Sequence, residues 1–153
     1  MKEKEEKDYN IRRISVDDYP HLIKWWKLYE DKGIRIPPAN LLPNKGLGGF
    51  VVEKDGRLIA SCFLYFTNSA MGYVDFLLAD PTYREDDRHD MVLELGVFVT
   101  KIAIGAGCEM VWALCANSSL LDLAKNPSTE AKGFNMLDQN FKIIYTYDAV
   151  NNN

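Results

Sequence analysis

The chain has 153 residues and a formal net charge of −4 at pH 7, with 47% hydrophobic and 26% charged residues. This length indicates one domain, and the composition excludes a disordered chain, a collagen-like repeat and a disulfide miniprotein. A negative net charge gives no overall field to attract nucleic acid or an anionic membrane, so neither is an expected partner. We expect a charged N-terminal tail at residues 1–8, a single domain at residues 9–150 and a short tail at residues 151–153.

The cysteines and histidines indicate neither a disulfide framework nor a metal site. Cys62, Cys108 and Cys115 are odd in number, have apolar neighbours and lack CxxC spacing, which predicts reduced, buried thiols. His21 and His89 have no partner at metal-ligand spacing, so no metal site is expected. The tail lacks the apolar region of a signal peptide, and no apolar run is long enough to span a membrane. These features together predict a cytoplasmic protein.

The first predicted elements are a short strand and an amphipathic helix. Residues 9–14 form a strand candidate, and Ser15 with Asp18 has the spacing of a capping box. The helix that follows has its apolar side chains at the i, i+3, i+4, i+7 positions Tyr19, Leu22, Ile23 and Trp26. This spacing predicts that Trp26 points into the core and that the adjacent Trp25 points outward. Gly33 is the expected stop.

A long proline-rich loop is expected at residues 34–47. Loops of this length without secondary structure are frequently functional. The alternative is a rigid loop that packs Leu41 and Leu42 on the core, and the sequence favours neither interpretation.

Three consecutive strands are predicted after this loop. Residues 49–53 and 57–66 are apolar and rich in β-branched and aromatic side chains, and Asp55-Gly56 between them is a strong hairpin signal. Asn68-Ser69 provides a second turn before a third strand at residues 71–79. The three strands therefore form an antiparallel meander.

A helix and further strands complete the predicted order. Residues 87–105 have helical spacing of apolar side chains, with Asp87 and Asp90 placed as an N-terminal cap pair. Residues 108–115 are apolar on both faces, which predicts a central strand, parallel to its predecessor by the right-handed crossover rule. A short helix at 118–125 and a strand at 141–147 follow. The fold class is therefore α/β (α+β): a mixed sheet with an antiparallel meander, then a parallel β-α-β unit, and helices on both faces.

The strand-to-helix passage Leu77-Leu78-Ala79-Asp80-Pro81-Thr82-Tyr83-Arg84, with the later Asn117 and Gly133-Phe134, resembles the GNAT N-acetyltransferases. Residues 38–47 and 64–69 resemble more specifically the GNAT-like proteins of tailed bacteriophages. The resemblance implies a GNAT fold and the transfer of an acetyl group from acetyl-CoA to a primary amine of a small molecule or a protein.

The resemblance also implies roles for individual residues. In the family, the strand that contains Leu77, Leu78 and Ala79 holds the pantetheine arm, and the following loop, with Arg84, Arg88 and His89, holds the phosphates at a helix N-terminus. Asp75 takes the position of a general base, although a structural acid would fit the sequence as well. Asn117 either bonds the pantetheine amide or caps the helix that begins after it.

Two departures from the family pattern lead to an alternative function. Asp87 and His89 occupy the positions where the family has glycines, and residues 80–90 carry five acids against Arg84 and Arg88. Both features predict weak or absent acetyl-CoA affinity, since side chains hinder the approach of phosphate to the backbone and acids repel it. The helix after Asn117 also lacks the tyrosine that many members use as a general acid. The alternative is a non-catalytic GNAT-fold protein that binds a protein partner or a second copy of itself.

Overall fold

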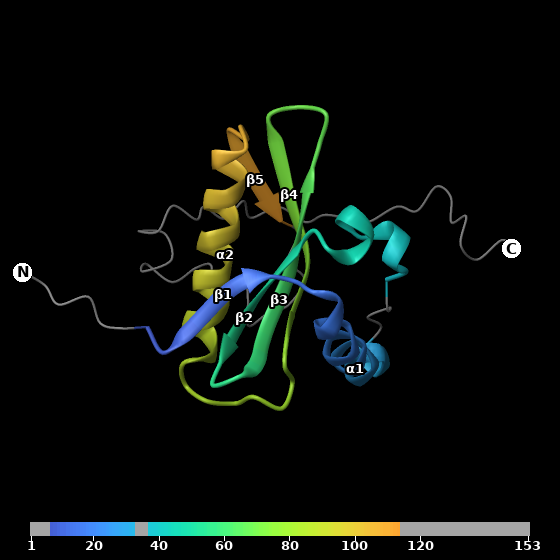
Figure 1. Cartoon of the computed structure of the whole chain (residues 1–153), viewed down its shortest axis with the longest axis vertical. Coiled ribbons are helices and arrows are strands. Elements are labelled where there is room, and N and C mark those ends of the chain that lie inside the picture. Colours follow the sequence, from blue (N-terminus) through green and yellow to red (C-terminus); the bar gives the residue numbers. More distant parts are fainter. Residues whose placement is uncertain (1–6, 33–36, 114–153) are drawn as a thin grey trace, which may run out of the picture.

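The computed structural model describes residues 7–32 and 37–113, which form a five-stranded sheet with a helix on each face (Figure 1). The strand order is β1-β2-β3-β4-β5. The strands are β1 (Tyr9–Arg13), β2 (Gly49–Lys54), β3 (Arg57–Phe66), β4 (Met71–Ala79) and β5 (Met110–Ala113). The helices are α1 (Tyr19–Tyr29) and α2 (Arg88–Gly105). Neither has the length and apolar character needed to cross a membrane.

The first four strands are antiparallel neighbours. The turn signals predicted this meander for β2, β3 and β4, whereas the pairing of β1 with β2 was not predicted. Asp55 and Gly56 both have positive φ, +50° and +74°, which is the backbone geometry of the tight hairpin turn between β2 and β3. At the next turn, the Thr67 hydroxyl donates to the Met71 carbonyl at 2.7 Å and ties the end of β3 to the start of β4.

The parallel crossover is also confirmed. β4 and β5 pair in parallel, from Met71 opposite Met110 to Val74 opposite Ala113, and α2 connects them. β5 begins two residues later than predicted, because Gly107 (φ +102°) first turns the chain out of α2. Within the described residues β5 is the last strand of the sheet, and Trp112 is 39% exposed. The expectation of a central strand depends on residues 141–147, which lie outside the described part.

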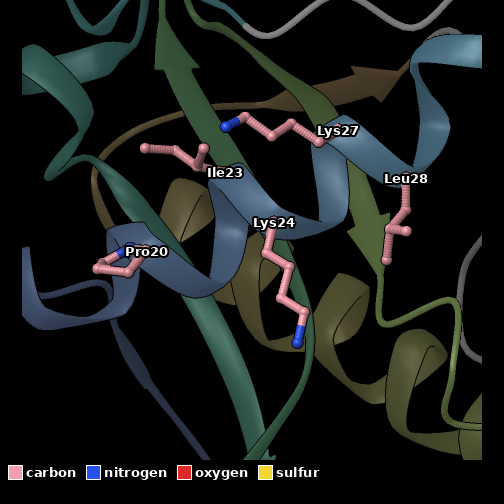
Figure 2. Close-up of a pocket in the computed structure, with 5 residues that line it drawn as sticks. All are labelled: Pro20, Ile23, Lys24, Lys27 and Leu28. Atoms are coloured by element: carbon pink, nitrogen blue, oxygen red, sulfur yellow. The ribbon is translucent and has the colours of Figure 1, made fainter.

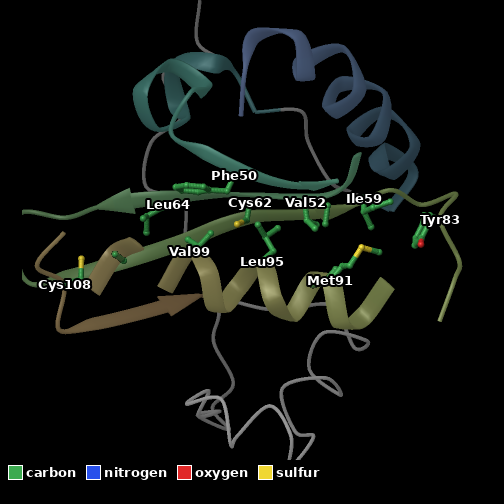
Figure 3. Packing of buried hydrophobic residues seen from close by; sticks show 13 residues of the cluster. Phe50, Val52, Ile59, Cys62, Leu64, Tyr83, Met91, Leu95, Val99 and Cys108 are labelled. Atoms are coloured by element: carbon green, nitrogen blue, oxygen red, sulfur yellow. The ribbon is translucent and has the colours of Figure 1, made fainter. Parts of the chain in front are cut away.

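Two apolar clusters hold the helices to opposite faces of the sheet. The cluster under α2 contains Met91, Leu95 and Val99 from the helix and Val52, Cys62 and Leu64 from the sheet (Figure 3). The cluster under α1 contains Leu22, Trp25 and Trp26 from the helix and Val51, Phe63 and Leu78 from the sheet. Helices therefore cover both faces, as the sequence predicts.

The prediction that Trp25 points outward is wrong. Trp25 and Trp26 are 4% and 1% exposed, while Ile23, predicted to face the core, is 37% exposed. Both rings belong to the cluster under α1, which also contains Leu42 from the segment that follows the helix. The buried side of α1 therefore differs from the one that the spacing of its apolar side chains predicts.

The ends of α1 and the segment after it differ from the expected loop in detail. A 3-10 turn (Val16–Asp18) precedes α1, and Ser15 donates its backbone N–H to Asp18 Oδ2 at 2.7 Å, as the predicted capping box requires. Three further 3-10 turns are described, one directly after α1 at Glu30–Lys32 and two at Ala39–Leu41 and Pro43–Gly46. Leu42 is buried as the rigid-loop interpretation expects, whereas Leu41 is 52% exposed. The expectations for Cys115, Asn117, residues 118–125, residues 141–147 and the C-terminal tail lie outside the described residues.

Candidate active site on strand β4

Asp75 lies at an irregularity in the middle of β4. Phe63 of β3 is opposite Asp75, but Ser61 is opposite Leu78, so β4 has one extra residue between these two pairs. This is a β-bulge, and Phe76 within it has a φ of +51°, which is a strained conformation for a bulky residue. The Phe76 ring packs edge-on against the Phe63 ring, with centroids 6.4 Å apart, and this contact helps to hold the strained backbone.

Both carboxylate oxygens of Asp75 accept one hydrogen bond. The Tyr73 hydroxyl donates to Oδ2 at 2.7 Å, and the backbone N–H of Phe76 donates to Oδ1 at 2.7 Å. The side chain is half-buried. Across residues 7–32 and 37–113, no lysine or arginine forms an ion pair with it. The bulge therefore fixes a half-buried carboxylate whose hydrogen-bond donors among the described residues are both neutral.

Aromatic side chains form a row beside Asp75. The Tyr65 and Tyr73 rings are 5.9 Å apart, and the Tyr73 and Trp112 rings are 4.5 Å apart. Burial, together with the nearby charge of Asp75, raises the pKa of Tyr65 to about 12. Burial and the hydrogen bond to Asp75 also raise the pKa of Tyr73 well above its usual value near 10. Both phenols are therefore protonated at neutral pH, and Tyr73 acts as a donor to the carboxylate.

The three β4 residues predicted to hold the pantetheine arm have different environments. Leu77, in the bulge, is 38% exposed, while Leu78 is 5% exposed in the cluster under α1. The Ala79 carbonyl accepts a hydrogen bond from the Tyr29 hydroxyl at 3.1 Å. The described pairing between β4 and β5 ends at Val74, so residues 75–79 have no partner in β5 as far as that strand is described.

The three loop residues predicted to bind phosphate lie before or in the first turn of α2. Arg84 and His89 are exposed, and Arg88 is half-buried. The Nε of Arg88 is fully buried and has no hydrogen-bond partner among the described residues. A buried N–H donor without a partner is uncommon, and the Nε of Arg88 is such a donor at the start of α2 among the described residues. Asn117, the remaining predicted contact, lies outside the described residues.

The predicted cap role of Asp87 is wrong. Asp87 directly precedes α2, but its carboxylate makes no hydrogen bond to the helix. It accepts instead from Lys54 Nζ and from the Tyr83 hydroxyl, each at 2.7 Å, and the Lys54 ammonium lowers the pKa of Asp87. Lys54 of β2 and Tyr83 of the loop thus take the place of the helix N–H groups as donors to this carboxylate. Lys54 is far from Asp87 in the sequence, so no local pattern indicated their contact.

A second acid of the loop is also paired. Asp80 accepts from Arg57 at 2.7 Å and from the Thr82 hydroxyl at 2.7 Å. Lys54 and Arg57 therefore join Arg84 and Arg88. Asp8 also pairs with Lys54 at 2.7 Å, so four cations stand against six acids, compared with two cations and five acids within residues 80–90 alone. No residue from 80 to 90 has a positive φ, so the side chains at the two family glycine positions are accommodated without left-handed strain. The loop is less repulsive to an anion than its sequence alone indicates.

Other parts of the surface do not coincide with this site. A hollow of about 330 Å³ on the outer side of α1 is lined by Pro20, Ile23, Lys24, Lys27 and Leu28, none of which is a predicted site residue (Figure 2). In the described part of the chain, no group of three or more His, Cys, Asp or Glu side chains could hold a metal ion. Tyr65, Tyr73 and Trp112 are site residues that the sequence did not predict. The available signal was the pair of tyrosines four residues before and four residues after Ser69, at the turn between β3 and β4.

No family model and no curated protein matches this sequence. Solved structures do match. An aminoglycoside acetyltransferase from an uncultured soil metagenomic sample, in complex with sisomicin, gives a TM-score of 0.64 at 20% identity, covering 92% of this chain and 97% of that chain. Glucosamine-6-phosphate N-acetyltransferase from Arabidopsis thaliana gives 0.58 at 14% identity, covering 93% and 100%.

The N-acetylglutamate synthase of Neisseria gonorrhoeae, complexed with coenzyme A and N-acetyl-glutamate, gives a TM-score of 0.61 at 19% identity. The match covers 84% of this chain but only 32% of the synthase chain. At these identities the likeness establishes the architecture. Together with the strand order, the bulged β4 and the β4–α2–β5 crossover, it shows that this chain has the fold of the GNAT N-acetyltransferases.

Proposed function

We propose that the protein is an N-acyltransferase that moves an acetyl group from acetyl-CoA to a primary amine. The observation that carries this proposal is Asp75. It is a half-buried carboxylate with no ion-pair partner among the described residues, held by Tyr73 and the bulge of β4. A carboxylate fixed in this way can accept a proton from a nucleophile beside it. The shared fold supports the proposal, since N-acetyltransferases carry the same architecture.

The residues present fit acetyl-CoA at two places. The exposed guanidinium of Arg84 and that of Arg88, whose Nε has no hydrogen-bond partner among the described residues, would meet the phosphates at the start of α2. The edge of β4 from residue 75 to residue 79 would meet the pantetheine amides. Bound acetyl-CoA supplies an activated acyl group as a thioester. The chain contributes orientation and a proton acceptor, which are the two main requirements for this transfer.

The proposed transfer forms one bond and breaks one. The amine nitrogen, positioned at Asp75, forms a bond to the acyl carbon while the carbon–sulfur bond breaks and the thiolate leaves. The ammonium of the acceptor first gives one proton to Asp75, which leaves the nitrogen free to attack. After the new bond has formed, the nitrogen gives its second proton to the thiolate, which leaves as the free CoA thiol. Tyr73 keeps the carboxylate in place through its 2.7 Å hydrogen bond, since its phenol stays protonated at neutral pH.

Replacing Asp75 with Asn tests this role. The amide cannot accept a proton, so we expect kcat/KM for acetyl transfer to fall by about 10²- to 10⁴-fold. Release of the free CoA thiol measures the rate. Asp55→Asn is the matched control: it removes the same charge at the β2–β3 turn, where the positive φ of +50° suits Asn. An Asp75→Asn enzyme as active as the control would exclude Asp75 as the base.

A second candidate function is a non-catalytic binding protein, and the side chains at the two family glycine positions favour it. Calorimetric titration with acetyl-CoA at low salt separates the two functions. Because the side chains of Asp87 and His89 stand at the two family glycine positions, we expect acetyl-CoA to bind with a dissociation constant weaker than about 1 μM. The Nε of Arg88 has no partner among the described residues, so we expect Arg88→Ala to weaken acetyl-CoA binding further. Lys101→Ala, which removes an exposed charge near the other end of α2, is the control. Absence of any binding by the wild type would favour the binding-protein function.

A further inference from the structure

The side chains around Asp75 lie on the same face of the sheet. Tyr73 is directly opposite Tyr65 of β3 and directly opposite Trp112 of β5. Asp75 is two residues beyond Tyr73, and its own partner, Phe63, belongs to the cluster under α1. Side chains at alternating positions of a strand share one face. Three aromatic rings and one carboxylate therefore form a continuous surface on the face that α1 partly covers.

This surface offers hydrogen-bond acceptors and π faces, and within residues 7–32 and 37–113 no lysine or arginine contacts it. The Asp75 carboxylate and the two phenol oxygens are acceptors, and Trp112 is 39% exposed. Among the residues that the structure describes, no lysine or arginine makes a hydrogen bond, ion pair or cation–π contact with Tyr65, Tyr73, Asp75 or Trp112. A surface of this kind attracts an ammonium group, through the carboxylate and through the ring quadrupoles.

We propose that the acceptor is a primary ammonium on a body without any anionic group, whose saturated or ring face packs on Tyr73 and Trp112. This proposal rests on the proposed acetyl transfer, and it specifies the class of amine. A carboxylate or phosphate elsewhere on the acceptor would lie close to Asp75, and no described lysine or arginine contacts Tyr65, Tyr73, Asp75 or Trp112 to balance it. Coulomb repulsion at such short range weakens binding by about tenfold or more.

Two pairs of small amines test the proposal, since each pair differs by one anionic group. Glucosamine is compared with glucosamine-6-phosphate, and 1,5-diaminopentane with lysine. Calorimetry, with and without CoA, measures the binding of each. Fluorescence provides an independent readout: the chain has three tryptophans, and Trp25 and Trp26 are buried, so a change on binding reports Trp112.

We expect the anion-free member of at least one pair to bind at least about tenfold more tightly than its partner. Asp75→Asn should remove this preference, and Trp112→Phe should abolish the fluorescence change while leaving a ring to pack against. Equal affinities within both pairs, a preference for the anionic members, or no binding of any of the four amines would overturn the proposal.

The assay with acetyl-CoA then separates the two proposals. Selective binding of an anion-free amine without its acetylation would sustain the binding site and contradict the acetyl transfer. Preferential acetylation of glucosamine-6-phosphate or lysine would sustain the acetyl transfer and contradict the selectivity.

Discussion

Arg12 holds the start of α1 to the edge of the sheet through paired hydrogen bonds. Its Nη1 and Nη2 donate to Asp18 Oδ2 and Oδ1 at 2.8 and 2.9 Å, and Nη2 also donates to Glu53 Oε2 at 3.1 Å. Asp18 is 5% exposed, so its charge is well shielded from water. The Arg12 guanidinium holds the pKa of Asp18 below its usual value near 3.8. This group therefore makes stability depend on pH.

We expect the Asp18–Arg12 contribution to be complete above about pH 4 and to disappear at lower pH. The folded-state pKa is lowered, so the stabilisation exists above the unfolded-state value and is lost as pH falls through the folded-state value. Asp18→Asn should cost about 1–2 kcal/mol at pH 7, since Arg12 is partly exposed to solvent. Thermal unfolding at pH 7 and pH 3 measures this. A difference between variant and wild type that is equally large at both pH values would contradict the assignment.

At the scale of elements, the turn segment before β2 is fixed against α1 at Gly46. Asn44, Lys45 and Gly46 all have positive φ, and Gly46 reaches +95°. A β-carbon at Gly46 would overlap the hydroxyl and ring of Tyr19, at the start of α1. Glycine is therefore needed here for two independent reasons, its backbone conformation and the close approach of an aromatic side chain.

Gly46→Ala and Gly56→Ala form a matched pair that separates these two reasons. Gly56 also has a positive φ, but a β-carbon there would meet no atom within 4 Å. We expect Gly56→Ala to cost about 1–2 kcal/mol from backbone strain alone. Gly46→Ala should cost about 1–3 kcal/mol more, because Tyr19 must also move. Denaturant unfolding at pH 7 gives the free energy of unfolding of both variants. Equal losses would show that Tyr19 moves aside at no cost in stability.

At the scale of the whole molecule, the position of β4 between the two clusters explains how the candidate site is held. Leu78 packs under α1, while Val74 packs against the cluster under α2, so both faces of the strand are fixed. Phe76 can therefore be kept at a φ of +51°, and the bulge presents Asp75 and Leu77 in fixed positions. A strained residue persists in this way only where the surrounding packing determines its conformation.

The sequence by itself determined most of the fold. Residues 57–66 and 71–79 were predicted with the observed bounds, because alternating apolar side chains and an Asp-Gly turn are local signals. The crossover at residues 88–105 and the parallel β5 followed from helical periodicity and chain handedness. Asp75 was identified as a candidate base through its place in the strand, and this role stays a prediction.

Only the tertiary structure decided the contacts between residues distant in sequence. Lys54 and Arg57 pair with Asp87 and Asp80, which changes the charge of the loop, and no local pattern encodes such pairings. Trp25 is buried in a cluster that also contains side chains of the sheet and Leu42 from a later segment, and helix periodicity carries no information on these neighbours. The row formed by Tyr65, Tyr73 and Trp112 likewise exists only once three strands are in register. Periodicity and turn chemistry act over a few residues, whereas charge pairing and ring stacking depend on positions that folding alone brings together.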